Sequence, residues 1–232
     1  MVPDGTLVPL AALGATLGLD VVSFPQAMLS RPIVAATVAG AVVGNPMGGL
    51  VAGATLELFA LETLPVGASR YPEWGSAAVV GGALFAMQPE LRAGTLLFAV
   101  LAAITTAYVG GESMVLLRRL NAQLARAQRD RIAEGSARHV VGLQAAGLGF
   151  DLLRGFLIAV VALGLWGPLM ERLLPGVGAS PAGARAVTVG AAATVAGGAV
   201  WKLVHAVPRA RGLFLGGLTL GLVLMLVLEA GR

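Results

Sequence analysis

The sequence predicts an all-α, polytopic membrane protein with broken or re-entrant helices in its N-terminal third and spanning helices after it. Of the 232 residues, 57% are hydrophobic and 12% are charged, about half the ~25% charged fraction of soluble domains. The mean hydropathy is +0.85, so lipid is the expected solvent. At ~20 residues per spanning helix, the chain has room for roughly six to eight membrane segments.

Apolar stretches give the elements in chain order. They cover residues 7–19, 33–66, 74–87, 94–117, 140–166, 186–201 and 213–228. The first and third are short for a bilayer, and the second is too long for one crossing and is split by "GNPMGG". Segments interrupted by Gly and Pro are typical of broken helices whose free backbone groups face protein or a water-filled cavity.

These stretches predict a single membrane domain over residues 1–232. Its expected parts are a re-entrant, site-bearing part (1–90), a spanning helix (91–117), a cytoplasmic basic connector (118–139) and C-terminal helices (140–232). The start of the chain has no basic segment and carries Asp4, so we expect it to begin the mature fold rather than a cleaved signal.

Composition also excludes several classes of function. The net charge of +4 comes from arginines in membrane-flanking loops. This placement indicates that the arginines set the orientation of the chain in the membrane and do not bind nucleic acid. The chain has no Cys, so disulfides, thiolate nucleophiles and Cys metal sites are excluded. The sequence contains no glycine-rich phosphate loop or HExxH-type zinc motif, and its two histidines, His139 and His205, have no nearby acidic residue to orient them beside a serine. We therefore expect no catalytic residues, no metal site and no cofactor.

The basic connector, "RRLNAQLARAQRDRIAEGSARH", holds six Arg against Asp130 and Glu134. Its apolar positions have roughly helical spacing and predict an amphipathic helix, and the positive-inside rule places it in the cytoplasm. It is either a solvated connector or a docking surface for a soluble partner or anionic lipid. The candidate docking residues are Arg118, Arg119, Arg126, Arg129 and Arg131.

Several charged residues in apolar segments have structural explanations. Asp151 and Arg154 are three residues apart on a predicted helix, so they can neutralise one another on one face. Glu112, near a helix end, fits an interfacial position as well as a site. Glu73 lies in "SRYPEW", which indicates an exposed loop.

Asp20, Gln26 and Glu57 lack such explanations. We expect Asp20, Gln26 and Ser30 near one helical face, bent by Pro25. Glu57 lies deep in an apolar run and needs a distant partner, for which Arg31 is a candidate. Carboxylate, amide and hydroxyl groups beside broken helices suit a polyhydroxylated ligand, because sugar hydroxyls both donate and accept hydrogen bonds. The alternative is a buried polar lock between helices.

Residues 20–80, "DVVSFPQAMLSRPIVAATVAGAVVGNPMGGLVAGATLELFALETLPVGASRYPEWGSAAVV", resemble the mannose/sorbose-family IIC component of the bacterial phosphotransferase system. The specific features are a Gln before Ser-Arg-Pro, "GATLELFAL", and "VGAS" followed by "YP". The later segments fit the family more loosely, with an Arg-rich connector and then "HVVGLQAAGLGFDLLRGFLIA". At "GNPMGG" the family usually has Gly-Asp, where this chain has Asn45.

The resemblance implies a multi-pass sugar permease subunit of the bacterial inner (cytoplasmic) membrane. It implies a homologous IID membrane subunit as partner in an oligomer of IIC–IID units. It also implies soluble IIA and IIB components that phosphorylate the sugar as it emerges, while IIC itself carries no phosphorylated residue. A hexose-type sugar would move inward by alternating access. The substrate-binding residues would be Asp20, Gln26 and Glu57, with Ser30, Arg31 and Asn45 shaping the site.

A second hypothesis is a regulatory membrane protein that kept the fold and lost transport. Such a protein would use the basic connector to dock soluble phosphotransferase proteins. The sequence leaves this alternative open.

Overall fold

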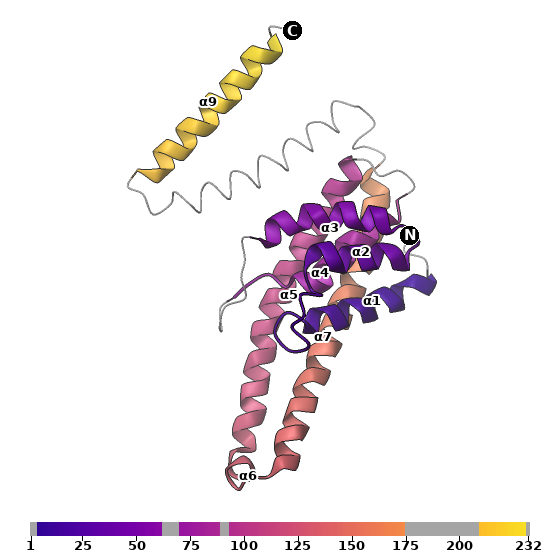
Figure 1. Cartoon of the computed structure of the whole chain (residues 1–232), viewed down its shortest axis with the longest axis vertical. Helices are drawn as coiled ribbons and strands as arrows, with labels where there is room; N and C mark the ends of the chain where they lie inside the picture. The colour runs from indigo at the N-terminus through magenta and orange to yellow at the C-terminus, as the bar shows by residue number, and fades with distance from the viewer. Residues whose placement is uncertain (1–3, 62–69, 89–92, 175–208, 231–232) are drawn as a thin grey trace. The chain divides into compact units, whose positions relative to one another are not determined.

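The computed structural model describes residues 4–61, 70–88, 93–174 and 209–230 (Figure 1). Within these ranges all regular structure is helical, which confirms the predicted all-α class. The chain divides into two compact units, Met1–Val187 and Thr188–Arg232. The expected apolar stretch 186–201 lies outside the described residues, and the single domain expected over 1–232 stays a prediction.

The helices follow one another in the order that the apolar stretches predict. The first unit contains α1 (Asp4–Leu19), α2 (Pro32–Val42), α3 (Pro46–Ala60), α4 (Trp74–Ala86), α5 (Ala93–Ala127), α6 (Arg129–Ala133) and α7 (Ala137–Leu173), and the second contains α9 (Ala210–Ala230).

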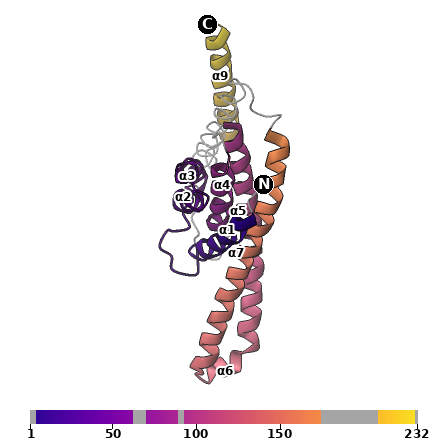
Figure 2. The same cartoon turned by 90° about the vertical axis from the view of Figure 1, so that its right-hand side faces the viewer.

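The helices of the N-terminal third are short. α1, α2, α3 and α4 have 16, 11, 15 and 13 residues. At 1.5 Å per residue even the longest measures about 24 Å, below the ~30 Å hydrocarbon thickness of a bilayer. In Figures 1 and 2, α2 and α3 lie beside each other and cross the long helices α5 and α7 at a steep angle. These lengths agree with the broken helices predicted for residues 1–90.

The break between α2 and α3 falls at "GNP", as the sequence predicts. Gly44 adopts a φ of 85°, and the N–H of Asn45 donates to Gly40 O at 2.8 Å while that of Gly44 donates to Ala41 O at 3.1 Å. This is the glycine-terminated Schellman ending of a helix. Pro46 then begins α3, where its missing N–H costs no hydrogen bond.

α4 is the central helix of the first unit. All its residues are buried, and it packs against α1, α2, α3, α5 and α7. A Cβ at Gly82 would lie 2.6 Å from Ala36 Cα in α2, and one at Gly81 would lie 2.8 Å from Ala103 Cβ in α5. Glycines at these contacts let the backbones approach closely, as is common between membrane helices.

α5 and α7 form a long hairpin closed by α6. They have 35 and 37 residues and pack against each other along the first unit (Figure 2). The structure differs from the expected boundaries, because α5 continues to Ala127 and does not end at residue 117. The expected amphipathic helix over 118–139 is therefore three pieces: the end of α5, α6 and the start of α7. We call residues 118–139 the basic hairpin tip.

Two helices in the described part of the chain are long and apolar enough to cross a membrane, Gly94–Ala127 and Ala137–Leu173. Both carry large apolar side chains with high exposure, such as Leu116 at 68% and Val161 at 65%. Contiguous exposed apolar surface marks a lipid or protein contact. In the second unit, α9 is a 21-residue apolar helix, in agreement with the predicted stretch 213–228.

Candidate functional site

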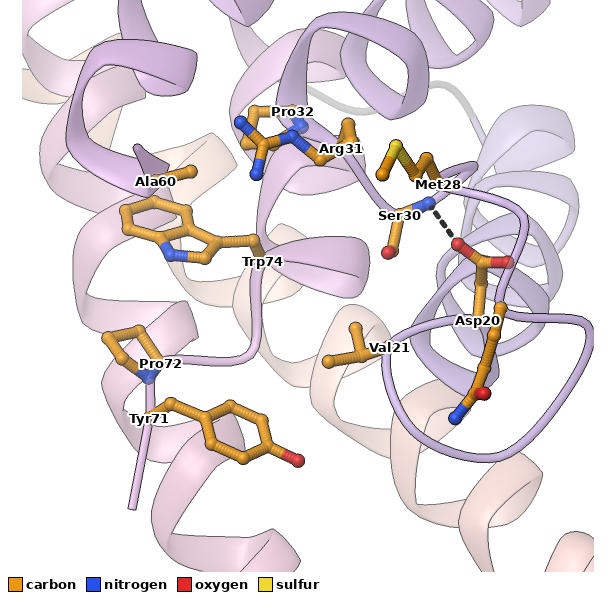
Figure 3. Close-up of a pocket in the computed structure, with 11 residues that line it drawn as sticks. Asp20, Val21, Met28, Ser30, Arg31, Pro32, Ala60, Tyr71, Pro72 and Trp74 are labelled. Atoms are coloured by element: carbon orange, nitrogen blue, oxygen red, sulfur yellow. Dashed lines mark hydrogen bonds between the residues drawn. The ribbon is translucent and has the colours of Figure 1, made fainter. Parts of the chain in front are cut away.

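A cavity of about 350 Å³, which we call the pocket, opens beside the loop between α1 and α2 (Figure 3). This loop, residues 20–31, is named the site loop. The polar residues that line the pocket are Asp20, Gln26, Ser30 and Arg31. The remaining lining residues are Val21, Met28, Pro32, Ala60, Tyr71, Pro72 and Trp74. The volume lies at the small end of the ~300–1,000 Å³ range of ligand pockets.

The site loop is not helical, so the expected helical face through Asp20, Gln26 and Ser30 is wrong. α1 ends at Leu19, and Gln26 and Met28 take φ values of 59° and 61°. Residues other than glycine rarely adopt this left-handed region, so the loop turns back instead of continuing the helix. The turn nevertheless brings the predicted side chains to one pocket.

Asp20 holds the site loop closed. Its side chain is 2% exposed, with Oδ1 accepting from Ala27 N at 2.6 Å and Oδ2 from Ser30 N at 2.8 Å (Figure 3). Burial raises the pKa of this carboxyl, but hydrogen bonds from Ser30 and Ala27 outweigh burial, so the pKa lies below its usual value. The carboxylate therefore organises the backbone around the left-handed residues.

Gln26 remains exposed at the pocket and is tied to the loop by one bond. Its Nε2 donates to Val22 O at 2.9 Å. A primary amide has two N–H donors and a carbonyl acceptor. The side chain is therefore equipped to exchange hydrogen bonds with a hydroxylated ligand.

Arg31 pairs with Glu57, the partner considered from the sequence. The Arg31 guanidinium donates to Glu57 Oε1, and Glu57 Oε2 accepts from Ile33 N at 3.1 Å. The carboxylate thus satisfies an N–H at the start of α2, where negative charge is also favoured by the helix dipole. Glu57 lies behind the pocket lining and acts on the pocket through Arg31.

Asn45 lies away from the pocket, at the start of α3. Its Oδ1 accepts from Gly48 N at 2.9 Å, and its Nδ2 donates to Ala86 O at 3.1 Å. The side chain caps α3 and connects it to the end of α4.

Two aromatic residues, Tyr71 and Trp74, line the pocket and were not predicted as site residues. Both belong to the short segment that enters α4. The Tyr71 hydroxyl accepts from the Arg118 guanidinium at 2.6 Å, and the Arg118 Cζ lies 5.2 Å from the centre of its ring. Burial raises the pKa of Tyr71, and the charge of Arg118 offsets only part of that rise. The available sequence signal was the aromatic spacing in "YPEW", which we attributed to a loop.

The sequence profile of the phosphotransferase system sorbose-specific IIC component matches residues 6–180. The match covers most of the chain. This chain belongs to that family. It is a IIC membrane subunit for sugar transport in the phosphotransferase system, and no match was found among curated protein sequences.

Solved structures share the fold of this IIC chain. One, described as the structure of a membrane protein, has a TM-score of 0.70 at 19% identity and covers 99% of this chain and 94% of its own. Another comes from the mannose transporter ManYZ in complex with microcin E492, with a TM-score of 0.61 at 20% identity, covering 98% of this chain and 95% of its own. At these identities the likeness concerns the fold alone.

The prediction for Glu73 of the IIC chain was wrong. We expected it exposed in a loop, but its side chain is fully buried at 0% exposure. It caps α4 by accepting from Ser76 N at 3.0 Å through Oε1, while Oε2 has no hydrogen-bond partner in the part of the chain that the structure describes. A Cβ at Gly110 would lie 3.0 Å from Glu73 Cβ, so that glycine makes room for the buried side chain. The glycines that enclose it come from distant segments, which is why local sequence indicated exposure.

Asp151 and Arg154 form the predicted pair in α7, with Arg154 Nη2 2.8 Å from Asp151 Oδ1. The Arg154 side chain is 10% exposed and that of Asp151 is 3% exposed. The pair also reaches other elements. Ser23 in the site loop donates to Asp151 Oδ2 at 2.9 Å, and Arg154 donates to Gly110 O in α5 at 3.2 Å. The predicted neutral pair therefore connects α7 to both α5 and the site loop.

The arginines of the basic hairpin tip have two different environments. Arg118 donates to the hydroxyl of Tyr71, which lines the pocket, but is not itself a lining residue. Arg119, Arg126, Arg129 and Arg131 are exposed. Four of the five predicted docking residues thus remain accessible on the isolated IIC chain. Among the described residues, no group of His, Cys, Asp or Glu could hold a metal ion.

Proposed function

We propose that the pocket binds a neutral hexose-type sugar and that the IIC chain carries it inward by alternating access. The observation that carries this proposal is the convergence of Asp20, Gln26, Ser30 and Arg31 on one cavity of about 350 Å³, in a chain whose family transports sugars. Amide, hydroxyl and guanidinium groups supply both donors and an acceptor to sugar hydroxyls.

In this proposal Gln26, Ser30 and Arg31 contact the sugar directly. Asp20 and Glu57 contribute mainly by fixing their orientation, because their carboxylates already accept bonds from the site loop and from Arg31. Asn45 shapes the site from a distance by positioning α3 against α4. Short helices around a polar pocket agree with alternating access, in which one group of helices moves as a rigid body past another.

The transport cycle that we propose requires partners. A IID membrane subunit completes the permease in an oligomer of IIC–IID units within the bacterial cytoplasmic membrane, and a IIB component phosphorylates the emerging sugar after receiving phosphate from IIA. The exposed arginines of the basic hairpin tip, Arg119, Arg126, Arg129 and Arg131, give a positive surface on which an acidic face of IIB docks.

Radiolabelled hexose uptake tests this function in bacterial cells without their own mannose-family permease. The IIC chain is expressed with and without its IID subunit, in wild-type form and as Gln26→Ala. We expect uptake that depends on IID and on phosphoenolpyruvate, and a fall of roughly tenfold or more in the variant, since a lost hydrogen bond leaves polar groups unpaired. Gln144→Ala, an exposed amide in α7 outside both the pocket lining and the basic hairpin tip, is the matched control. Absence of uptake for a broad sugar panel, with the protein present in the membrane, contradicts transport.

A further inference from the structure

We propose that Tyr71 and Trp74 form an aromatic wall that packs against the C–H face of a pyranose ring and decides which sugar the pocket accepts. The inference rests on the proposed sugar binding and goes further by naming the shape of the ligand and the residues that select it. Neither residue belongs to the polar set that the sequence predicted.

The aromatic wall lies on the side of the pocket opposite the polar residues Asp20 and Ser30. Figure 3 shows Tyr71 and Trp74 on one side, with Asp20 and Ser30 on the other. Both aromatic residues are mostly buried, at 8% and 9% exposure, and both line the cavity. A ligand in the pocket therefore meets aromatic surface on one side and hydrogen-bonding groups on the other.

α5 holds the wall in place through three contacts. Arg118 donates to the Tyr71 hydroxyl at 2.6 Å. The N–H of Glu73 donates to Ala107 O at 2.8 Å. A Cβ at Gly111 would lie 2.3 Å from Tyr71 O, so only glycine allows the segment to lie this close to α5. A wall fixed before binding loses little conformational entropy when the ligand arrives.

The chemistry of a pyranose fits this division. Its hydroxyls point outward around the rim, and its C–H groups gather on the faces of the ring. The negative face of an aromatic ring attracts C–H groups and excludes water from them. A hydroxyl that projects from that face towards the wall loses its water without gaining a partner, which is costly. The wall therefore selects among epimers by the hydroxyls on one face of the sugar.

Charge favours a neutral sugar over an acidic one. Among the described residues that line the pocket, Arg31 is the one cation, and its guanidinium is already paired with Glu57. Asp20 adds a carboxylate to the lining. An anionic ligand, such as a sugar acid or a sugar phosphate, would approach without an uncompensated positive charge to receive it.

A fluorescence titration tests the wall directly. The chain has three Trp, so Trp166→Phe with Trp201→Phe leaves Trp74 as the single reporter. The full chain, purified with its IID subunit carrying Phe at its Trp positions, is titrated with glucose, mannose, galactose and the acyclic polyol sorbitol. We expect a saturable change in Trp74 emission with at least one pyranose and none with sorbitol, because only a closed ring presents a C–H face.

Ring substitutions then measure the contribution and the selectivity of the wall. In the chain with its native Trp residues, Tyr71→Leu and Trp74→Leu should weaken calorimetric binding of the preferred sugar roughly tenfold and change the ratio of Kd values between epimers. Tyr71→Phe and Trp74→Phe keep a ring and should retain most of the affinity. Tyr108→Leu removes an aromatic residue that is 63% exposed and lies outside the pocket lining, and should change neither quantity.

The outcomes separate the two proposals. Sugar binding that is undiminished in both Leu variants, with epimer ratios unchanged, overturns the aromatic wall and leaves sugar transport standing. A folded wild-type chain with IID that binds no sugar in the panel contradicts the proposed function and the wall together. If a Leu variant fails to fold, the Trp74 emission decides the wall alone. Sugar binding that calorimetry detects but that leaves Trp74 emission unchanged overturns the wall.

Discussion

Charged side chains at the pocket are held by specific partners. The Arg31–Glu57 pair is partly buried, with 29% and 18% of the side chains exposed, and Glu57 also accepts from Ile33 N. Removing one member of such a pair leaves the other charge desolvated and unpaired, which costs more than the pair contributes. The pair therefore joins α2 to α3 and presents the Arg31 guanidinium to the pocket in one orientation.

A double-mutant cycle measures this coupling. We expect Arg31→Gln and Glu57→Gln each to lower the free energy of unfolding in detergent by about 1–3 kcal/mol. The double variant should be less destabilised than the sum of the two, because no unpaired charge remains. Costs that add to within about 0.5 kcal/mol would contradict an energetic coupling between the two residues.

A separate prediction concerns Asp20, because its two carboxylate oxygens accept hydrogen bonds from two backbone N–H groups of the site loop. Asp20→Asn keeps one acceptor and replaces the other with a donor, so one of these bonds is lost. We expect the site loop, with Gln26 and Met28 in the left-handed region, to open more often and to be cleaved faster by added protease. Asp130→Asn, on the exposed basic hairpin tip, serves as the control. Equal cleavage rates in all three proteins would show that Asp20 does not hold the loop.

At the scale of the helices, close packing depends on a few glycines. Gly82 in α4 faces α2, where an added Cβ would lie 2.6 Å from Ala36 Cα. Gly164 in α7 is also helical, and an added Cβ there meets no described residue within 4 Å. The same substitution at these two positions therefore has opposite physical consequences.

We expect Gly82→Ala to lower the free energy of unfolding by about 1–3 kcal/mol, because α2 and α4 must move apart. Gly164→Ala should be neutral or raise it by up to about 1 kcal/mol, because alanine is the better helix former. Thermal unfolding followed by circular dichroism gives both values. A Gly82→Ala protein as stable as Gly164→Ala would mean that the α2–α4 contact is looser than described.

The sequence predicted those parts of the fold that depend on local chemistry. The glycine and proline of "GNP" place the α2–α3 break correctly because they act on their own backbone. The burial of Glu73 was missed because the glycines that make room for it, Gly18 in α1 and Gly110 in α5, are distant in the sequence. The pocket lining was predicted in part. Gln26 and Ser30 carried a polar signal within an apolar run, whereas Tyr71 and Trp74 gain their role only from a cavity formed by distant segments.

At the scale of the whole molecule, the α5–α7 hairpin is longer than a bilayer is thick. At 1.5 Å per residue, 35 residues of α5 extend about 52 Å, against ~30 Å of hydrocarbon. About 20 Å of the hairpin must therefore lie outside the hydrocarbon region. Leu101, Tyr108 and Leu116 are exposed along α5 beside Glu112, which pairs with Arg70, and the exposed Arg119 and Arg126 follow. We therefore place the boundary between Leu116 and Arg119.

Because the chain contains no Cys, single cysteines can locate both the boundary and the side of the membrane. A maleimide needs an aqueous thiolate, so Leu101→Cys, Tyr108→Cys and Leu116→Cys should stay unlabelled, and Arg119→Cys and Arg126→Cys should react. By the positive-inside rule the reactive positions face the cytoplasm, and a membrane-impermeant reagent should reach them in inverted vesicles but not in intact cells. Labelling of Arg126→Cys in intact cells would reverse the orientation and remove the surface proposed for IIB. Labelling of Tyr108→Cys would instead place water along α5, beside Ala107, to which the aromatic wall segment is bonded.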